Sequence, residues 1–310
     1  DLCVEFKTMA GTVHAVDHLS YTLHRGEKLG IVGESGSGKS VSSLAMMQLI
    51  PNPPGKVTGG QILYNGKDLV KLSEREMQKI RGNEISMIFQ EPMTSLNPII
   101  RCGKQIAESL RLHRGMKKKE AMEEAIKMMQ AVGIANPQAR AYEYPHQMSG
   151  GMRQRVMIAM ALACQPQILI ADEPTTALDV TIQAQILDLI RDLNQEMNTS
   201  VVFITHDLGV VSELCDTVIV MYNGHIVEKA PTTDIFREPL HPYTQGLLNS
   251  IPRLDEDVEL LNTIEGTVPA PDAMPAGCRF APRCPYGKDR CMKEKPGVYH
   301  AENSLVSCFR

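Results

Sequence analysis

The fold of this chain is decided by the stretch Gly33-Glu34-Ser35-Gly36-Ser37-Gly38-Lys39-Ser40. It matches the pattern G-x-x-x-x-G-K-[ST], whose glycines let backbone N–H groups approach phosphates and surround them. An apolar run over residues 28–33 precedes the motif and predicts a buried strand, and a helix is expected to begin near Lys39. Such a helix directs its positive end at the phosphates. The pattern therefore predicts a loop that binds ATP for hydrolysis.

The side chains at the end of this loop have expected tasks. The Lys39 ammonium is expected to reach the outer phosphates, and the Ser40 hydroxyl is expected to bind Mg²⁺. The glycines contribute backbone N–H groups, because without a side chain they can come close to the ligand. The residues expected to contact the nucleotide here are Gly33, Ser35, Gly36, Ser37, Gly38, Lys39, Ser40 and Val41.

Length and charge narrow the class of protein. The chain has 310 residues, of which 43% are hydrophobic, enough for one large domain with an appendage or for two domains. A net charge of −4 gives no reason to expect nucleic acid as a partner. The longest apolar run, residues 156–164, is too short to span a bilayer, and the first residues lack the features of a signal peptide. We therefore expect a cytoplasmic protein that reaches any membrane through partners.

Strands and helices are expected to alternate along the first 235 residues. The predicted strands are 28–33, 61–64, 85–89, 168–171 and 201–205, and the predicted helical regions are 103–160 and 181–197. Strands that are apolar at nearly every position are typical of a parallel sheet covered by helices on both faces, so an α/β fold is predicted. From residue 236 prolines accumulate and periodicity is lost, which predicts a separate region over 236–310.

Polar side chains follow three of the predicted strands. Asp172 and Glu173 end one strand, where a carboxylate can steady Mg²⁺ and its neighbour can act as general base for the attacking water. Gln90 follows another and is expected to orient water or bind Mg²⁺. His206 follows a third and is expected to hydrogen-bond the γ-phosphate. Each signal is weak alone, but beside a phosphate loop they predict a catalytic set of Glu173, His206 and Gln90.

A second glycine-containing loop, Ser149-Gly150-Gly151, precedes a predicted helix. Its hydroxyl and its helix N-terminus also suit phosphate. One nucleotide does not need two such loops from one chain. We therefore expect a dimer in which Ser149 and Gly151 of each chain cover the ATP bound by the other.

Taken in order, these motifs resemble the ATP-binding subunits of ABC transporters over residues 1–235. The similar segments are Walker A at 33–40, the Q-loop at Gln90, the signature at 148–152, Walker B at 168–172 followed by Glu173, the D-loop at 177–179 and the switch His206. Met148 stands where the family usually has Leu, a swap that keeps volume and apolarity. The resemblance implies a P-loop NTPase fold with a RecA-like core and a helical subdomain at about 91–155. It also implies an aromatic residue stacked on adenine, for which Phe6 is the candidate and His14 the alternative.

Three further segments resemble the oligopeptide/dipeptide importer branch of that family. They are residues 89–98, 144–147 and 241–252, and the spelling at 93–95 is closer to the D-type than to the F-type ATPase. The resemblance implies a heterodimer with an F-type subunit under two membrane permease subunits, served by an extracytoplasmic peptide-binding protein. The chain would lie at the cytoplasmic face of the plasma membrane and power peptide import. Import of nickel or another small solute, and a soluble non-transport ABC ATPase, are the alternatives.

Four cysteines crowd the region 236–310, namely Cys278, Cys284, Cys291 and Cys308. A cytoplasmic protein seldom needs disulfides, so the group indicates a metal site. Structural zinc sites favour tight C-x₂₋₄-C pairs, which are absent here, whereas Fe–S clusters accept wider spacing. We therefore favour Fe–S over Zn²⁺, and the D-type ATPases that this region resembles imply a [4Fe–4S] cluster. A structural role is expected, because a proline-rich segment lacks its own core.

Overall fold

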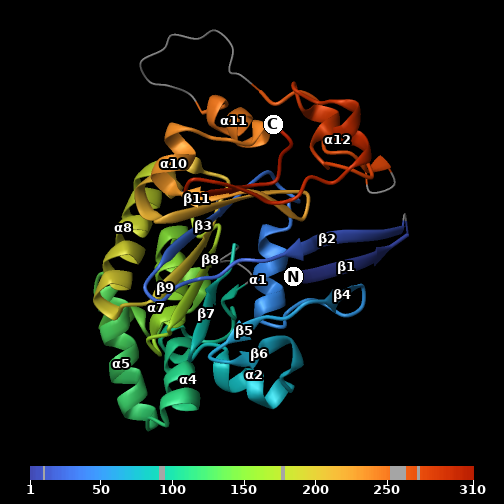
Figure 1. Cartoon of the computed structure of the whole chain (residues 1–310). Helices are drawn as coiled ribbons and strands as arrows, with labels where there is room; N and C mark the ends of the chain where they lie inside the picture. The colour runs from blue at the N-terminus through green and yellow to red at the C-terminus, as the bar shows by residue number, and fades with distance from the viewer. Residues whose placement is uncertain (10, 91–94, 176–178, 252–262, 271–272) are drawn as a thin grey trace. The chain divides into compact units, whose positions relative to one another are not determined.

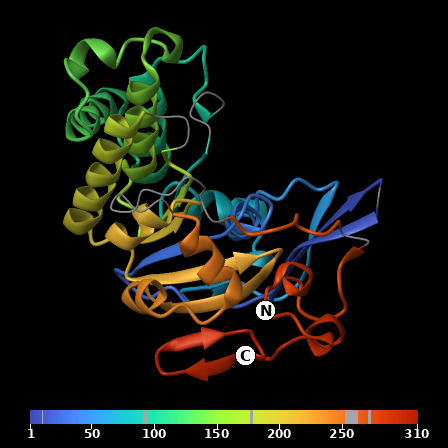
Figure 2. The same ribbon diagram turned by 90° about the horizontal axis from the view of Figure 1, so that it is seen from above.

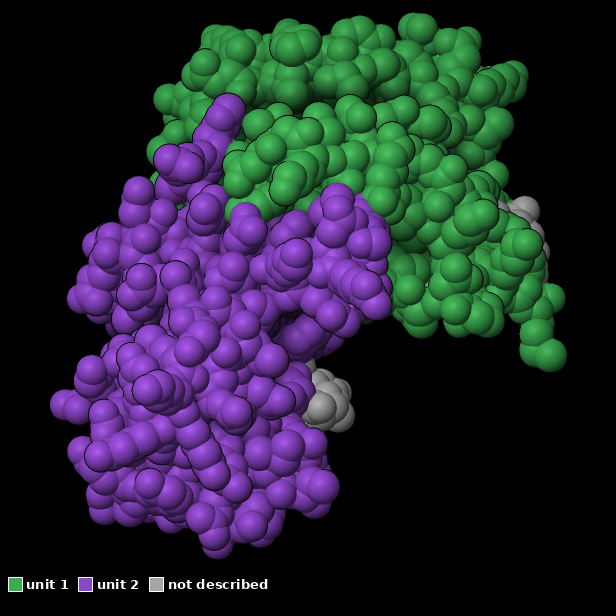
Figure 3. Space-filling view, turned by 90° about the horizontal axis from the view of Figure 1, so that it is seen from below, with its two compact units in different colours: residues 1–23, 27–71, 204–310 green, residues 24–26, 72–203 purple. Residues whose placement is uncertain are grey.

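The computed structural model describes residues 1–9, 11–90, 95–175, 179–251, 263–270 and 273–310 (Figure 1). They form two compact units, coloured separately in Figure 3. Unit 1, in green, contains residues 1–23, 27–71 and 204–310, and unit 2, in purple, contains residues 24–26 and 72–203. The phosphate loop therefore belongs to unit 1, and Ser149-Gly150-Gly151 belongs to unit 2.

The main sheet of unit 1 is built on strand β3 (Lys28–Val32), which leads into the phosphate loop. Strand β10 (Thr217–Tyr222) runs parallel to it, and β11 (His225–Pro231) runs antiparallel on the other side of β10. Both β3 and β10 are apolar at nearly every position and are buried. This pattern fixes a strand inside a sheet, because neither face can be turned to water without loss of hydrophobic burial.

A second sheet of unit 1 comes from the N-terminal segment. Its order is β2-β1-β4, with β1 (Leu2–Thr8), β2 (Gly11–Leu19) and β4 (Gly55–Gly59) all antiparallel. Helix α1 (Lys39–Met46), which begins at the phosphate loop, packs against β1 and β2. The hairpin of β5 (Leu63–Tyr64) and β6 (Lys67–Asp68) follows, and then the 3₁₀ turn η1 (Leu69–Lys71).

The C-terminal segment extends the main sheet of unit 1. Helix α9 (Leu208–Leu214) lies before β10, and the C-terminal segment is residues 232–310. Its described elements are α10 (Thr232–Arg237), α11 (Pro242–Asn249), η4 (Ala281–Arg283), α12 (Asp289–Lys293), β12 (Tyr299–Ala301) and β13 (Ser304–Val306). Strand β13 pairs with β11, so the order becomes β12-β13-β11-β10-β3. Figure 2 shows the β12–β13 hairpin in red beside the orange strands.

Three aromatic side chains anchor this segment. Phe280 is buried, with its ring centroid 5.2 Å from that of Tyr222 and 5.3 Å from that of Tyr243. Tyr222 and Tyr243 meet edge to face at 4.8 Å. Such pairs contribute roughly 0.5–1.5 kcal/mol each beyond the area that they bury. Tyr243 and Phe280 of the segment thus attach it to β10 through Tyr222.

Unit 2 contains a parallel strand pair and a group of helices. Strand β7 (Ile85–Ile88) pairs in register with β8 (Ile168–Asp172), and β9 (Ser200–Ile204) lies on the other side of β8; the last residue of β9 belongs to unit 1. The helices are α2 (Glu74–Ile80), α4 (Cys102–Arg114), α5 (Lys118–Ala131), α6 (Pro137–Arg140), α7 (Gly150–Leu162) and α8 (Val180–Met197), with the 3₁₀ turn η2 (Pro145–Gln147). Helices α4, α5 and α7 pack against one another, and α7 also packs against β7.

Most of the predicted elements are confirmed. The strands expected at 28–33, 85–89, 168–171 and 201–205 and the helix expected at 181–197 are β3, β7, β8, β9 and α8. The strand expected at 61–64 is shorter, residues 63–64: the Ile62 N–H donates to the Asp68 carboxylate at 3.1 Å, and Asn65 and Gly66, with φ values of 48° and 77°, turn the chain back after Tyr64. In the described part of the chain, no helix combines the length and the apolarity needed to cross a membrane.

Candidate nucleotide site

The phosphate loop is a tight backbone cradle at the end of β3. A Cβ atom at Gly33 would lie 2.1 Å from the Met221 carbonyl oxygen, and one at Gly38 would lie 2.3 Å from that of Ala15. Both glycines also have positive φ, 151° and 96°. Only glycine fits such positions, because any side chain would meet backbone atoms that cannot move aside. The sequence motif is therefore explained by packing inside unit 1.

The Lys39 side chain lies within the phosphate loop. Its Nζ donates to the carbonyl oxygens of Gly33 and Glu34 at 2.8 and 3.0 Å, and the residue is only 5% exposed. Its N–H group is among the first of α1, where the helix dipole places about half a positive charge. Among the described residues the buried Ser37 hydroxyl has no hydrogen-bond partner. A buried positive charge and an unsatisfied hydroxyl are groups that a phosphate can satisfy.

Phe6 lies on β1, in the sheet that borders this loop. It pairs with Val13 across the sheet, two residues before Ala15, whose carbonyl oxygen occupies the space beside Gly38. A Cβ atom at Gly55 would lie 2.7 Å from the Phe6 ring, so the ring rests against backbone on one side. The alternative, His14, is exposed and forms an ion pair with Glu5 at 3.2 Å. A half-buried ring near the loop suits stacking on adenine, which stays a prediction.

In unit 2 the carboxyl ends of two parallel strands bring Gln90 and Glu173 together. Ile88 pairs with Ala171, and two residues beyond each, Gln90 Nε2 donates to Glu173 Oε2 at 3.0 Å. Glu173 has a φ of 45°, unusual for a residue other than glycine. Backbone strain of this kind concentrates at functional sites. Asp172, the last residue of β8, is 5% exposed.

The second glycine loop opens helix α7, also in unit 2. The Ser149 hydroxyl accepts from the Met152 N–H at 3.3 Å and caps the helix. The space beside Gly150 is open, whereas a Cβ atom at Gly151 would come within 3.1 Å of Ile182. Arg155 fixes α7 by donating to the Val132 carbonyl at 2.6 Å. The loop is thus exposed and mounted on a well-held helix.

The structure places the remaining predicted residues as follows. His206 is exposed and lies in unit 1, two residues after the end of β9, and the preceding residue, Thr205, donates its N–H to the carbonyl of Ile31 on β3 at 3.2 Å. Asp179 caps α8 by accepting from the Ile182 N–H at 3.0 Å. Residues 91–94 of the peptide-importer motif and residues 177–178 of the D-loop lie outside the described residues.

Residues that the sequence did not single out surround the phosphate loop. The Gly224 N–H donates to the Ser37 carbonyl at 2.8 Å, and the Glu34 N–H donates to the Tyr243 hydroxyl at 2.8 Å. The Glu34 carboxylate binds Arg283 at 2.7 and 3.0 Å. Glu34 occupies a variable position of the motif, so the motif alone carries no signal for these contacts.

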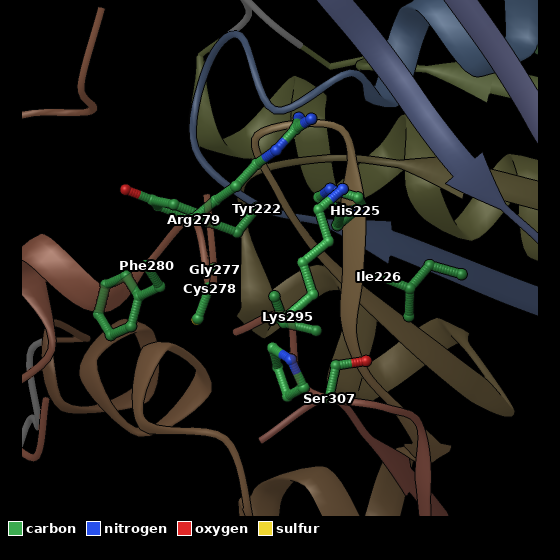
Figure 4. Close-up of a pocket in the computed structure, with 11 residues that line it drawn as sticks. Tyr222, His225, Ile226, Gly277, Cys278, Arg279, Phe280, Lys295 and Ser307 are labelled. Carbon is green, nitrogen blue, oxygen red and sulfur yellow. The ribbon is translucent and has the colours of Figure 1, made fainter. Parts of the chain in front are cut away.

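The four C-terminal cysteines are free thiols within one small region of unit 1. Burial raises the pKa of the Cys278 thiol, the N–H groups of Phe280 and Ala281 act in the opposite direction, and the neighbouring thiols of Cys284 and Cys308 raise it further. Cys308 accepts from the Arg310 N–H at 3.4 Å. Cys278 also lines a pocket, shown in Figure 4 together with Lys295 and Ser307.

The separation of these sulfur atoms bears on the kind of metal group that fits. Two thiolates on one tetrahedral Zn²⁺, each at about 2.3 Å, lie about 3.8 Å apart. Among the described residues, which include all four cysteines, no three of these sulfur atoms lie within 4.8 Å of one another. A multi-iron cluster is larger and binds more widely spaced thiolates, and N–H donors toward sulfur stabilise such ligands. In this structure the four thiols are therefore not gathered around a point that a single zinc ion could occupy, and four thiolates in one region are also the donor set that Fe–S clusters use.

Comparison with known proteins gives matches along the whole chain. Residues 16–176 match the family described as ABC transporter, and residues 227–291 match the family described as oligopeptide/dipeptide transporter, C-terminal region. The oligopeptide transport ATP-binding protein AppD of Bacillus subtilis is 56% identical over 96% of this chain and 91% of its own length. The dipeptide transport ATP-binding protein DppD of Bacillus subtilis is 52% identical, and the oligopeptide transport ATP-binding protein OppD of Salmonella typhimurium is 51% identical, each over 100% of this chain and 92% of its own length.

The chain belongs to the ABC transporter family. The family and the α/β fold predicted from the sequence are thereby confirmed. A dimeric ATP-binding cassette, MJ0796, solved in a post-hydrolysis state with ADP and Pi, superimposes on this ABC ATPase with a TM-score of 0.67. It is 29% identical in sequence and covers 74% of this chain and 96% of its own chain.

Proposed function

We propose that this ABC ATPase is the ATP-hydrolysing subunit of an importer of dipeptides or oligopeptides. Hydrolysis is supported above all by the hydrogen bond between Gln90 and Glu173 at the ends of β7 and β8. Peptide import is supported by relatives named as oligopeptide and dipeptide transport proteins, which align along nearly all of this chain. The match at residues 227–291 supports the same branch.

In the proposed mechanism, Phe6 stacks on adenine and the phosphate loop binds the phosphates. Lys39 exchanges its two carbonyl partners for the outer phosphates, which costs little because its ammonium is already positioned. The residues that contact the nucleotide are Phe6, Gly33, Ser35, Gly36, Ser37, Gly38, Lys39, Ser40, Val41 and Asp172. Ser40 and Gln90 would hold Mg²⁺, which neutralises phosphate charge when bound. The Gln90 amide suits this role, because its nitrogen donates to Glu173 and an amide oxygen is a ligand that Mg²⁺ accepts.

Glu173 acts as the general base. It accepts a proton from water while the water oxygen bonds to the γ-phosphorus and the bond to the β–γ bridging oxygen breaks, which yields ADP and phosphate. His206 steadies the γ-phosphate. The Glu173 carboxylate is held by Gln90, so the base is oriented before water arrives.

The active state is proposed to be a dimer with an F-type ATPase. Ser149 and Gly151 of this chain cover the partner's ATP, because the open space at Gly150 and the free end of α7 suit an approaching phosphate. Closure of the dimer moves two membrane permease subunits that receive peptide from an extracytoplasmic binding protein. The chain then lies at the cytoplasmic face of the plasma membrane.

The substitution Glu173→Gln tests the assignment of the base. Turnover is expected to fall by about 10²-fold or more, while ATP stays bound and the dimer with its partner subunit stays closed. ATP retention after gel filtration and the rate of phosphate release are the measurements. Hydrolysis at the native rate would show that another group activates water.

The solute is tested on the chain co-purified with its native membrane partners and reconstituted in vesicles. Dipeptides or oligopeptides presented with the binding protein are expected to raise ATP turnover, and Ni²⁺ is expected to have no effect. Stimulation by Ni²⁺ alone would favour the alternative importer.

We further propose that Cys278, Cys284, Cys291 and Cys308 hold a [4Fe–4S] cluster that clips the C-terminal segment together. Anaerobically purified chain is then expected to be brown and to contain about four iron and four sulfide ions per chain. Stoichiometric zinc without iron would favour the alternative ion and contradict this proposal.

A further inference from the structure

The second residue of the phosphate loop, Glu34, is gripped by two side chains that lie more than 200 positions away in the sequence. Arg283 donates from both terminal nitrogens to both carboxylate oxygens, at 2.7 and 3.0 Å. The Tyr243 hydroxyl accepts the Glu34 N–H at 2.8 Å. A two-point guanidinium–carboxylate contact fixes direction as well as distance. The side chain and the backbone of Glu34 are thus both held by the C-terminal segment.

Arg283 has little freedom of its own. Its side chain is 6% exposed, its Nε donates to the Glu265 carbonyl at 3.1 Å, and its Nη2 donates to the Ile264 carbonyl at 3.3 Å. Burial of a guanidinium is costly without such partners, and Glu34 supplies the compensating charge. The Arg283 guanidinium is therefore held in place, and a shift of the backbone at residues 281–283 would shift it as well.

That backbone lies between two of the metal-site cysteines. The Ala281 N–H donates to the Cys278 carbonyl at 3.0 Å, and the Cys284 N–H donates to the Ala281 carbonyl at 3.3 Å. Arg283 is the residue immediately before Cys284, at the end of the turn η4. Because the turn is only three residues long, a group that fixes the sulfur atoms of Cys278 and Cys284 also fixes Arg283.

Arg283 binds Glu34, and Glu34 in turn contacts Lys39, the lysine proposed to bind the phosphates. The Glu34 carbonyl accepts from Lys39 Nζ at 3.0 Å, and its N–H donates to Tyr243. Displacement of Glu34 would therefore move the backbone that aims both the loop and the ammonium. Binding of phosphates depends on that preorganisation, because a mobile loop must be ordered when the ligand arrives.

We infer that Arg283 and Tyr243 are positioning residues of the phosphate loop, and that through Arg283 nucleotide affinity depends on the state of the four-cysteine site. The inference rests on the proposed function of the loop and of the cysteines. Coupling between two sites is reciprocal. Bound nucleotide should therefore slow the loss of the metal group as much as an intact group strengthens nucleotide binding.

The first experiment measures the Kd of a fluorescent ATP analogue for the full chain and for Arg283→Gln, Glu34→Gln and the double variant. Each single variant is expected to weaken binding about tenfold, because the loop must then be ordered by the ligand. The double variant is expected to match the singles, since both remove one interaction. Arg283→Lys should recover part of the affinity, because it keeps the charge but loses the fork. Tyr243→Phe, which removes the hydroxyl that accepts the Glu34 N–H, should weaken binding by a smaller factor.

Arg237→Gln is the matched control. Arg237 lies in the same segment, on α10, but its partner at 3.1 Å is Asp234 rather than the phosphate loop, and its side chain is exposed. Its affinity for the analogue is expected to equal that of the native chain. Thermal unfolding of every variant separates a displaced loop from a misfolded chain, and recovery by Arg283→Lys gives a second check.

The second experiment follows the release of iron or zinc to a chelator, by absorbance, with and without ADP. Nucleotide is expected to slow release about tenfold in the native chain and to have no effect in Arg283→Gln. Native affinity in Arg283→Gln, or equal release rates in the native chain with and without ADP, would overturn the inference. A native chain that binds neither nucleotide nor metal would instead overturn the proposed function.

Discussion

At Gly38 the backbone has a φ of 96°, and the place of a side chain is taken by the Ala15 carbonyl oxygen. Glycine is therefore required at position 38 for two separate reasons: its backbone angles are unfavourable for other residues, and a neighbouring strand leaves no space for a side chain. Position 38 cannot be relaxed by moving a flexible side chain, because the obstacle is backbone. The loop's shape is thus determined residue by residue rather than by the helix that follows it.

The substitution Gly38→Ala is expected to lower the free energy of unfolding by about 2 kcal/mol or more and to abolish nucleotide binding. Denaturant unfolding and equilibrium binding of a fluorescent ATP analogue measure the two effects. Gly297→Ala is the control, because no atom lies within 4 Å of its Cβ position and its φ is ordinary; its stability is expected to change by less than about 0.5 kcal/mol. A stable Gly38→Ala chain would show that the loop can shift away from Ala15.

A single residue, His241, is expected to make the free energy of unfolding depend on pH. Burial lowers its pKa to about 4, and its Nδ1 accepts the Tyr243 N–H at 3.1 Å, so it is neutral when folded. The unfolded chain, with a His pKa of about 6.5, binds more protons between pH 6.5 and 4, so stability is lost as pH falls through that window. Acidification from pH 7 to 5 is expected to cost about 2 kcal/mol from this group.

His241→Asn tests this. Asn can still cap α11 but does not titrate, so the fall in melting temperature between pH 7 and pH 5 should be smaller than in the native chain. An equal fall in both proteins would assign the acid sensitivity to other groups, such as the half-buried His225, whose pKa desolvation also lowers to about 4.

At the scale of elements, helix α7 carries the loop that is proposed to cover the partner's ATP. Ser149 caps it, and Arg155 ties it to the end of α5 through the Val132 carbonyl. The helix is buried along most of its length, so its exposed N-terminus is held at a fixed place in unit 2. A rigid mount of this kind suits a group that must meet a phosphate on another chain.

Ser149→Ala is expected to cost about 1 kcal/mol of stability through the lost cap, but to reduce ATP turnover of the assembled dimer by about tenfold or more. Ser73→Ala is the matched control, because Ser73 caps α2 in the same unit through a capping box with Glu76. The two variants should unfold alike and differ in phosphate release. Equal turnover would mean that Ser149 serves only its own helix.

Strands could be predicted from the sequence where nearly all of their side chains are buried. β3, β7, β8 and β9 are apolar at nearly every position, so their pattern is unambiguous. Strands β1, β2 and β4 were not predicted, because charged residues and glycines interrupt their alternation and their pairing comes from distant segments. The residues proposed for catalysis could be picked out from the sequence because each lies within two residues of the end of such a strand. The ion pair between Arg283 and Glu34 could not be predicted, because no sequence feature near either residue indicates it.

At the scale of the whole molecule, the C-terminal segment is joined to the rest of unit 1 by strand pairing, by an aromatic cluster and by the contact with Glu34. None of these contacts requires the segment to have a hydrophobic core of its own. The proposed metal group would add a covalent tie among four positions that otherwise share little regular structure. Loss of one ligand should therefore loosen the segment before it unfolds the sheet.

Cys278→Ser is expected to lower the metal content, to lower the melting temperature and to make the bonds around residues 277–296 accessible to protease. Metal analysis, calorimetry and limited proteolysis provide the measurements. Cys3→Ser, at a half-buried cysteine outside the group, is the control and should retain the metal. Protease resistance in Cys278→Ser would mean that the aromatic cluster alone secures the segment.

The pairing of β13 with β11 has a consequence for how the protein is made. Strand β11 ends at Pro231 and its neighbour begins only at Ser304, so on the ribosome the edge of β11 emerges long before the strand that covers it. An uncovered edge can pair with another nascent chain. Slow or interrupted translation between these points is therefore expected to lead to aggregation, and chaperones that shield sheet edges should favour its folding.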